Sequence, residues 1–176
     1  TGSLAVCMGT VGPGAVHLLN GLYDAKKSHA PVLAICGQVP REEMGTEFFQ
    51  EVDNDALFAD VAVFNRTVTS IDQLPMLIEQ AGNAAIQDSG VAVLTLPGDV
   101  GGLDLPKGTA VPKFVDTRPR SMPAPDVVQQ AASLLNEADS VTLLVGQGAR
   151  EARAEVLELA SLLAAPMVLT LKAKEG

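Results

Sequence analysis

A glycine-rich turn and a nearby histidine are the first residues of this 176-residue chain whose types and spacing could do chemistry. Gly12-Pro13-Gly14 separates an apolar run from a segment of helical period, and His17 follows early in that segment. Glycines let the backbone approach a ligand closely, proline suits the first helical position, and helix N–H groups favour anions. Histidine is the usual acid–base group near pH 7. The pattern indicates a ligand site, although a turn that binds nothing and a surface histidine fit it too.

A polar and acidic stretch over residues 38–55 holds a second candidate group, Phe48-Phe49-Gln50-Glu51. Long ordered loops are often functional, and a phenylalanine pair in such a loop needs something to pack against, such as a substrate or a partner subunit. Gln50 can both donate and accept hydrogen bonds. The alternative is a loop that the phenylalanines only anchor. The carboxylates of the stretch do not follow calcium-loop spacing, so they indicate a solvated face, and we assign no metal ligand.

A third candidate is the run from Gly146 to Arg150, which again follows a strand-like segment and opens a helix. It has the first two glycines of the dinucleotide fingerprint, but Glu151 stands where the third would be. Arginine can pair with phosphate or stack on a ring. The next strand-like run ends nearby in the expected sheet, which favours a cofactor pocket over an empty fold. The candidate residues are Gly146, Gly148, Ala149, Arg150, Thr170, Leu171 and Lys172.

The elements that must position these groups alternate between apolar runs of strand length and segments of helical period. Continuous apolar strands separated by helices are typical of a parallel sheet covered on both faces. The expected strands are 4–8, 31–37, 60–68, 91–97, 141–146 and 166–171, and the expected helices are 16–25, about 70–87, 126–137 and 150–164.

The predicted fold class is α/β, with parallel sheets that carry helices on both faces, in two incomplete doubly wound, Rossmann-like domains. Residues 1–105 would form most of the first domain, and residues 123–176 would form the opening βαβ unit of the second. Between them, residues 106–122 form a proline-rich stretch without sustained period, which is typical of an interdomain linker.

Composition excludes several classes of function. Twelve basic residues against 21 acidic ones give a net charge of −9, and aromatic residues make up 3%, so nucleic acid is not an expected partner. No apolar run reaches the roughly 18 residues of a membrane span. Cys7 and Cys36 lie inside apolar runs, which indicates small buried side chains in a reducing compartment. We therefore expect a cytoplasmic protein.

Three longer segments of the sequence resemble a known enzyme family. They are GPGAVHLLNGLYDAKKSHAPVLAICGQVP, FFQEVDNDALFADV and GVAVLTLPGDV. In combination they resemble the thiamin diphosphate-dependent enzymes, and within that family the pyruvate oxidases and quinone-dependent pyruvate dehydrogenases. The resemblance runs through nearly the whole chain. It implies that residues 1–105 are the C-terminal part of a pyrimidine-binding domain and that residues 123–176 begin a central FAD domain.

The resemblance also implies roles for the candidate residues. Gly12, Pro13 and Gly14 would contact the aminopyrimidine side of the cofactor, and His17 would approach the cofactor or its covalent intermediate. Phe49 and Gln50 would lie at the active-site entrance. Acetolactate synthases look similar but carry asparagine at the position of His17, and this difference favours the pyruvate-oxidising branch. The residues that would cradle FAD are Gly146, Gly148, Ala149, Arg150, Thr170, Leu171 and Lys172.

The implied reaction is the oxidative decarboxylation of pyruvate or another 2-keto acid. Carbon dioxide leaves, two electrons pass to FAD, and quinone or oxygen reoxidises the flavin. One alternative is an acetolactate synthase-like carboligase in which FAD is structural. Another is a nucleotide-binding or assembly module that kept the fold without the chemistry.

The resemblance further implies a homo-oligomer, a dimer or a tetramer, because thiamin sites in this family lie between subunits. The family's activating glutamate is expected upstream of Thr1, and the domain that binds magnesium and the cofactor diphosphate is expected downstream. We therefore expect this chain alone to be inactive and to bind thiamin diphosphate poorly. Contact with a membrane surface is expected only through regions outside this chain.

Overall fold

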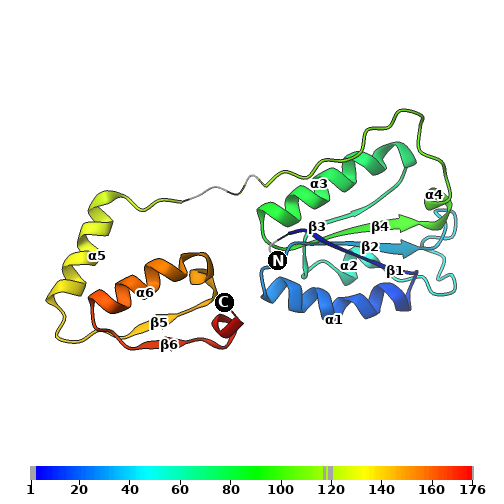
Figure 1. Cartoon of the computed structure of the whole chain (residues 1–176). Coiled ribbons are helices and arrows are strands. Elements are labelled where there is room, and N and C mark those ends of the chain that lie inside the picture. Colours follow the sequence, from blue (N-terminus) through cyan, green and yellow to red (C-terminus); the bar gives the residue numbers. More distant parts are fainter. Residues whose placement is uncertain (1–2, 117, 119–120, 176) are drawn as a thin grey trace. The chain divides into compact units, whose positions relative to one another are not determined.

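The computed structural model describes residues 3–116, 118 and 121–175 and divides into two compact units (Figure 1). Unit 1 is Thr1–Pro119 and unit 2 is Arg120–Gly176. Both contain parallel strands joined through helices. The α/β class with Rossmann-like character, predicted from the alternation of apolar runs and helical periods, is therefore confirmed.

Unit 1 is built on a four-stranded sheet in the order β1-β2-β4-β3, with every neighbouring pair parallel. The strands are β1 (Ala5–Gly9), β2 (Val32–Gln38), β3 (Ala62–Thr67) and β4 (Val91–Pro97). Because all four run the same way, their carboxyl ends share one edge of the sheet. At that edge Gln38 pairs with Pro97, and Thr67 pairs with Thr95.

Helices cover both faces of this sheet. Helix α1 (Pro13–Lys27) lies below it in Figure 1 and α3 (Leu74–Gln87) lies above it. Successive residues of a strand point to opposite faces, so β2 and β4 supply two separate cores. The core on the α1 side contains Ala15, Leu22, Ala34, Cys36, Phe58, Val61, Val91 and Val93. The core on the α3 side contains Leu33, Val68, Leu77, Ala81, Ala85, Ala92, Leu94 and Val100.

Two short helices interrupt stretches in which we expected none. Helix α2 (Asn54–Leu57) ends the acidic stretch, and α4 (Gly98–Gly101) follows β4 directly. Asp53 begins α2, because its carboxylate accepts a hydrogen bond from the Ala56 N–H at 3.0 Å. A four-residue helix is too short to show an apolar period, which explains why the pattern missed both.

The segment 106–122, expected to be a linker, is in part packed on unit 1. The Val115 N–H donates to Asn83 Oδ1 on α3 at 3.0 Å. The Phe114 ring occupies the space beside Gly82, where a Cβ atom would overlap it. The first part of this segment therefore contributes to the α3 side of unit 1.

Unit 2 is a βαβ arrangement preceded by a helix. Its elements are α5 (Pro125–Glu137), β5 (Leu143–Val145), a 3-10 turn η2 (Gln147–Ala152), α6 (Arg153–Leu162), β6 (Met167–Leu169) and a second 3-10 turn η3 (Leu171–Glu175). Strands β5 and β6 are parallel, with Val145 opposite Leu169. Ala160 and Ala165 are the buried apolar residues in the described part of unit 2. The helix expected from residue 150 starts at Arg153, because the glycine-containing turn before it is 3-10.

The two cysteines lie in unit 1 as free thiols, Cys36 fully buried and Cys7 half-buried. Burial raises the pKa of Cys36 to about 12, and the neighbouring Cys7 adds to the effect. Cys36 therefore behaves as a small apolar core residue, as predicted. Over the described ranges, none of the helices has both the length and the apolar character that a bilayer span requires.

Candidate functional site

The turn between β1 and α1 has a conformation that only glycine adopts readily. Gly12 stands at the helix start with φ 62° and ψ −110°, and no side chain caps the helix there. Pro13 follows at the first helical position, where its missing N–H costs nothing. The Ala15 N–H turns back to the Thr10 carbonyl at 2.9 Å. The end of β1 and the start of α1 are thus one tight unit.

The acidic stretch packs directly on this turn. A Cβ atom at Gly12 would overlap the Gln50 carbonyl oxygen and would lie 2.9 Å from the Gln50 Cβ atom. Gln50 itself has φ 66°, a left-handed conformation that costs a non-glycine residue free energy. The structure therefore brings together two candidate groups that are far apart in sequence, and it places backbone strain at their contact.

Two further glycines allow this close packing, and the sequence patterns did not single them out. A Cβ atom at Gly37, near the end of β2, would lie 2.9 Å from the Val11 backbone nitrogen. One at Gly9 would lie 2.6 Å from the Gly14 carbonyl oxygen. Their signal in the sequence was the position of each glycine at the carboxyl end of an apolar strand.

The side chains of the expected catalytic residues remain open to solvent. His17 lies exposed on α1, and the Phe49 side chain keeps 79% of its surface exposed. Phe48 is 45% exposed. Within the described chain, no core covers the phenylalanine pair, which leaves Phe49 available to a ligand or to another surface.

Two buried amides hold the carboxyl end of the acidic stretch against the sheet. The Gln38 side chain donates to the Val52 carbonyl at 2.6 Å and accepts from the Val39 N–H at 2.9 Å. Asn54 donates to the Gly37 carbonyl at 3.3 Å. Sequence reasoning missed both residues, because amides in a polar stretch give no sign of their burial.

An ion pair fixes the other end of the stretch. The Arg41 Nε atom lies 2.7 Å from Asp99 Oδ2, and the Arg41 backbone N–H donates to Asp99 Oδ1 at 3.0 Å. The same guanidinium donates to the Thr69 carbonyl at 2.7 Å. Arg41 thereby ties the stretch to α4 and to the segment after β3.

This pair predicts a pH dependence. The hydrogen bonds from Arg41 lower the pKa of Asp99 below its usual value. A carboxyl whose pKa is lowered by folding stabilises the fold above its unfolded pKa, about 3.9, and this contribution disappears as the pH falls through the folded pKa. In Arg41→Gln we expect the pKa of Asp99 to rise toward its ordinary value, and the loss of stability at acid pH to become smaller, because only the backbone N–H at position 41 still donates to Asp99.

Carboxyl-detected NMR titration would measure this change residue by residue. Asp60 is the internal control, because its lowered pKa depends on Tyr23 and Lys26 and not on Arg41. An unchanged pKa of Asp99 in Arg41→Gln would contradict the ion pair.

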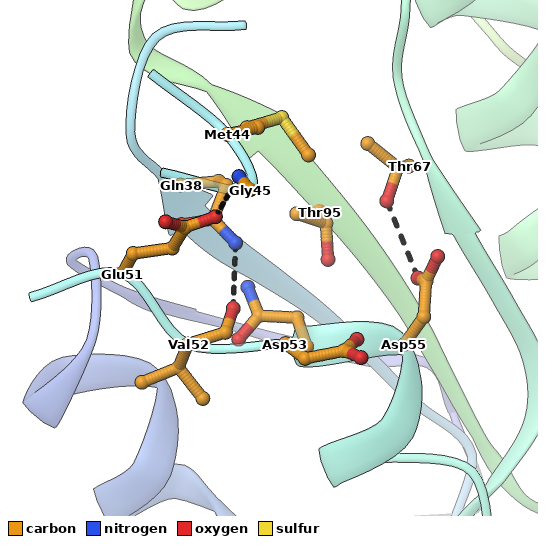
Figure 2. A pocket seen from close by; sticks show the side chains of 10 residues that line it. Gln38, Met44, Gly45, Glu51, Val52, Asp53, Asp55, Thr67 and Thr95 are labelled. Atoms are coloured by element: carbon orange, nitrogen blue, oxygen red, sulfur yellow. Dashed lines mark hydrogen bonds between the residues drawn. The ribbon is translucent and has the colours of Figure 1, made fainter. Parts of the chain in front are cut away.

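A pocket of about 270 Å³ opens at the carboxyl ends of β2, β3 and β4 (Figure 2). Strand residues form its floor, and the acidic stretch and the start of α2 form its wall. The lining residues are Gln38, Met44, Gly45, Glu51, Val52, Asp53, Asn54, Asp55, Thr67 and Thr95. Within the described ranges, no three or more His, Cys, Asp or Glu side chains are arranged to hold a metal ion.

In unit 2 the structure brings the third candidate group to one sheet edge. Gly146 begins the turn after β5, and the Ala149 N–H donates to its carbonyl at 3.1 Å. Thr170 follows β6, and its N–H donates to the Val145 carbonyl at 3.0 Å. A Cβ atom at Gly146 or Gly148 would meet nothing within 4 Å, so the turn is open. The remaining candidates at this edge, Arg150, Leu171 and Lys172, are exposed.

Comparison with known protein families finds two matches along the chain. Residues 1–57 match the family described as thiamine pyrophosphate enzyme, N-terminal TPP binding domain. Residues 128–176 match thiamine pyrophosphate enzyme, central domain.

Three relatives illustrate the similarity. Protein YdaP of Bacillus subtilis, whose name provisionally describes it as thiamine pyrophosphate-containing, is 44% identical over 99% of this chain and 30% of its own length. A pyruvate oxidase of Lactiplantibacillus plantarum is 36% identical over 99% of this chain and 29% of its own length. An acetolactate synthase of Arthrospira platensis is 35% identical over 99% and 31%, respectively. The chain therefore spans less than a third of the length of these relatives.

Proposed function

Since this chain belongs to the thiamine pyrophosphate enzymes, we propose that the intact protein oxidatively decarboxylates pyruvate and passes the electrons through FAD to quinone or oxygen. The contact between Gly12 and Gln50 carries the proposal. It joins the glycine turn, which begins the helix of His17, to the acidic stretch, which contains Phe49 and Gln50. We further propose a cytoplasmic homo-oligomer, with the magnesium ion held outside this chain.

The residues at the β1–α1 turn suit thiamine diphosphate. No side chain caps the helix start, and Gly12 and Gly14 are packed tightly against Gln50 and Thr10, which holds the turn in one conformation. When bound, this cofactor supplies an electron sink for the cleavage of a carbon–carbon bond. The exposed His17 would exchange a proton or a hydrogen bond with the reacting group. Phe49 would form an apolar wall that excludes water, and the Gln50 amide would orient the substrate.

The turn in unit 2 suits FAD for a similar reason. The backbone at Gly146 and Gly148 is open to close approach, and Arg150 is exposed beside it. An exposed guanidinium can pair with a phosphate or stack on a ring. FAD bound there would supply the electron acceptor.

A carboligase is the second candidate, and one observation favours it. The identity to the acetolactate synthase, 35%, nearly equals the identity to the pyruvate oxidase, 36%. In that case two keto acids would be joined and FAD would be structural. His17 supports the oxidising alternative, because the resemblance assigns asparagine to this position in the carboligases.

The visible spectrum of the intact protein distinguishes these functions. The protein is purified without added flavin and then mixed anaerobically with pyruvate, thiamine diphosphate and magnesium. Oxidation of pyruvate predicts flavin bands that bleach. Flavin bands that stay unchanged would favour the carboligase, and a protein without flavin would overturn the assignment of the Gly146–Arg150 turn.

The two histidines of the chain give a matched test of the proposed site. In the intact protein we expect His17→Asn to slow flavin reduction by pyruvate by about tenfold or more, because a positioned acid–base group is lost. His29→Asn is the control, since His29 is exposed in the turn after α1 and has no proposed role. Equal rates in the two variants would remove His17 from the mechanism.

A further inference from the structure

The pocket of Figure 2 has no role in the proposed reaction, yet it contains buried polar atoms without partners. Thr95 is 1% exposed and Asn54 is 2% exposed. Thr95 Oγ1 and Asn54 Oδ1 form no hydrogen bond within the described structure. Figure 2 shows the Thr95 hydroxyl directed into the space between Gln38 and Asp55. Buried polar atoms of this kind call for a missing partner, because leaving them unpaired costs free energy.

Both unpartnered atoms of the pocket can accept a hydrogen bond. The Asn54 amide nitrogen already donates to the Gly37 carbonyl, which leaves its oxygen free. Both polar atoms of the Gln38 side chain are used. A hydroxyl oxygen such as that of Thr95 can also accept. A hydrogen-bond donor is therefore the partner that could pair with both atoms.

The charge of the lining residues indicates the charge of this partner. The pocket is lined by Glu51, Asp53 and Asp55, and no lysine or arginine is among the lining residues. Asp53 accepts from the Ala56 N–H, and Asp55 accepts from the Thr67 hydroxyl at 3.2 Å. A carboxylate has about four lone-pair positions, so acceptor capacity remains on both. These carboxylates would therefore stabilise a donor that itself carries a positive charge.

We propose that this pocket binds a small aliphatic amine, a protonated ammonium group on a short carbon chain such as a diamine. An ammonium group has three N–H donors, which match Thr95, Asn54 and a carboxylate. A volume of about 270 Å³ exceeds what a bare ion needs and approaches the range of about 300–1,000 Å³ typical of ligand pockets. Met44 and Val52 supply apolar surface for the carbon chain. The described carboxylates are not arranged to chelate a metal.

Titration of the chain with 1,4-diaminobutane tests the proposal. We expect saturable one-to-one binding by calorimetry, with amide NMR shifts centred on Thr95 and Asn54. The neutral 1,4-butanediol, which has the same length, should give neither. Potassium chloride at the same concentration should also give no shifts at these residues.

Two variants separate the pocket from general attraction to an acidic protein. Thr95→Val keeps the charge and nearly the shape, and it should weaken binding by about tenfold or more, because a hydrogen bond to a charged group is lost. Asp53→Asn removes one charge but keeps a good helix cap, so it should weaken binding without unfolding α2. Thr109→Val, outside the pocket, should bind as the unchanged chain does.

Several outcomes would overturn the proposal. They are the absence of saturable binding, equal binding of the diol, and unchanged affinity in both Thr95→Val and Asp53→Asn. Equal shifts with potassium chloride would show an inorganic cation site instead.

The Thr95→Val variant also reports on the free pocket. Its melting temperature without amine should equal or exceed that of the unchanged chain, because it removes a buried hydroxyl that has no partner.

Discussion

Replacing Gly12 with alanine is expected to lower the free energy of unfolding of unit 1 by about 2–4 kcal/mol, because two costs add. The first is conformational, since φ 62° with ψ −110° is a backbone region that alanine rarely adopts. The second is steric, since the new Cβ atom would overlap the Gln50 carbonyl oxygen. Chemical denaturation followed by circular dichroism measures the loss.

Gly21→Ala, inside the helix that Gly12 precedes, is the matched control. A Cβ atom at Gly21 would meet nothing within 4 Å, so alanine adds only helix propensity there. We expect it to stabilise the unit by about 0.5–1 kcal/mol. If Gly12→Ala behaved like Gly21→Ala, the acidic stretch would not pack on the β1–α1 turn. The contact between Gly12 and Gln50 would then no longer support the proposed function.

The regular elements could be predicted because their burial leaves a period in the sequence. Strand β4 reads as a continuous apolar run since it is central in the sheet and covered on both faces. Helix α3 shows its apolar face at helical spacing, and Ser70 caps the turn before it. The four-residue helices α2 and α4 leave no period, so the sequence pattern predicts loop at both places. Their position is set by Asp53 and by the end of β4.

The arrangement of the site was less predictable than its residue types. The residue types of the glycine turn, His17 and the phenylalanine pair were enough to predict a ligand site. That Gln50 takes a left-handed conformation against Gly12 depends on the path of a long loop, which no local propensity encodes. Thr95 lies inside an apolar strand, where threonine reads as an ordinary strand former. Its unpartnered hydroxyl becomes visible only once the strand ends and α2 are placed together.

The largest loss of stability is expected from Phe58→Ala, about 3–5 kcal/mol. Phe58 is 0% exposed and directly follows α2, in the core between α1 and the sheet. Its ring packs in the cluster that contains Ala15 and Leu22 of α1, so its removal leaves a cavity between helix and sheet. Because α2 closes the acidic stretch, the variant should also loosen the wall of the pocket. Denaturant titration measures the loss, and Phe58→Leu should recover part of it.

Phe49→Ala, in contrast, should change stability by less than about 0.5 kcal/mol, because the Phe49 side chain is 79% exposed. Phe49→Ala and Phe58→Ala each remove a phenylalanine ring, and the two residues lie at opposite ends of the segment 49–58. In the intact protein we expect Phe49→Ala to slow flavin reduction by pyruvate while its unfolding stays unchanged. A large loss of stability in Phe49→Ala would make this ring a loop anchor and remove it from the site. A small loss of stability in Phe58→Ala would mean that α2 does not close the core. The segment 49–58 would then lack the rigid end that a preorganised site requires.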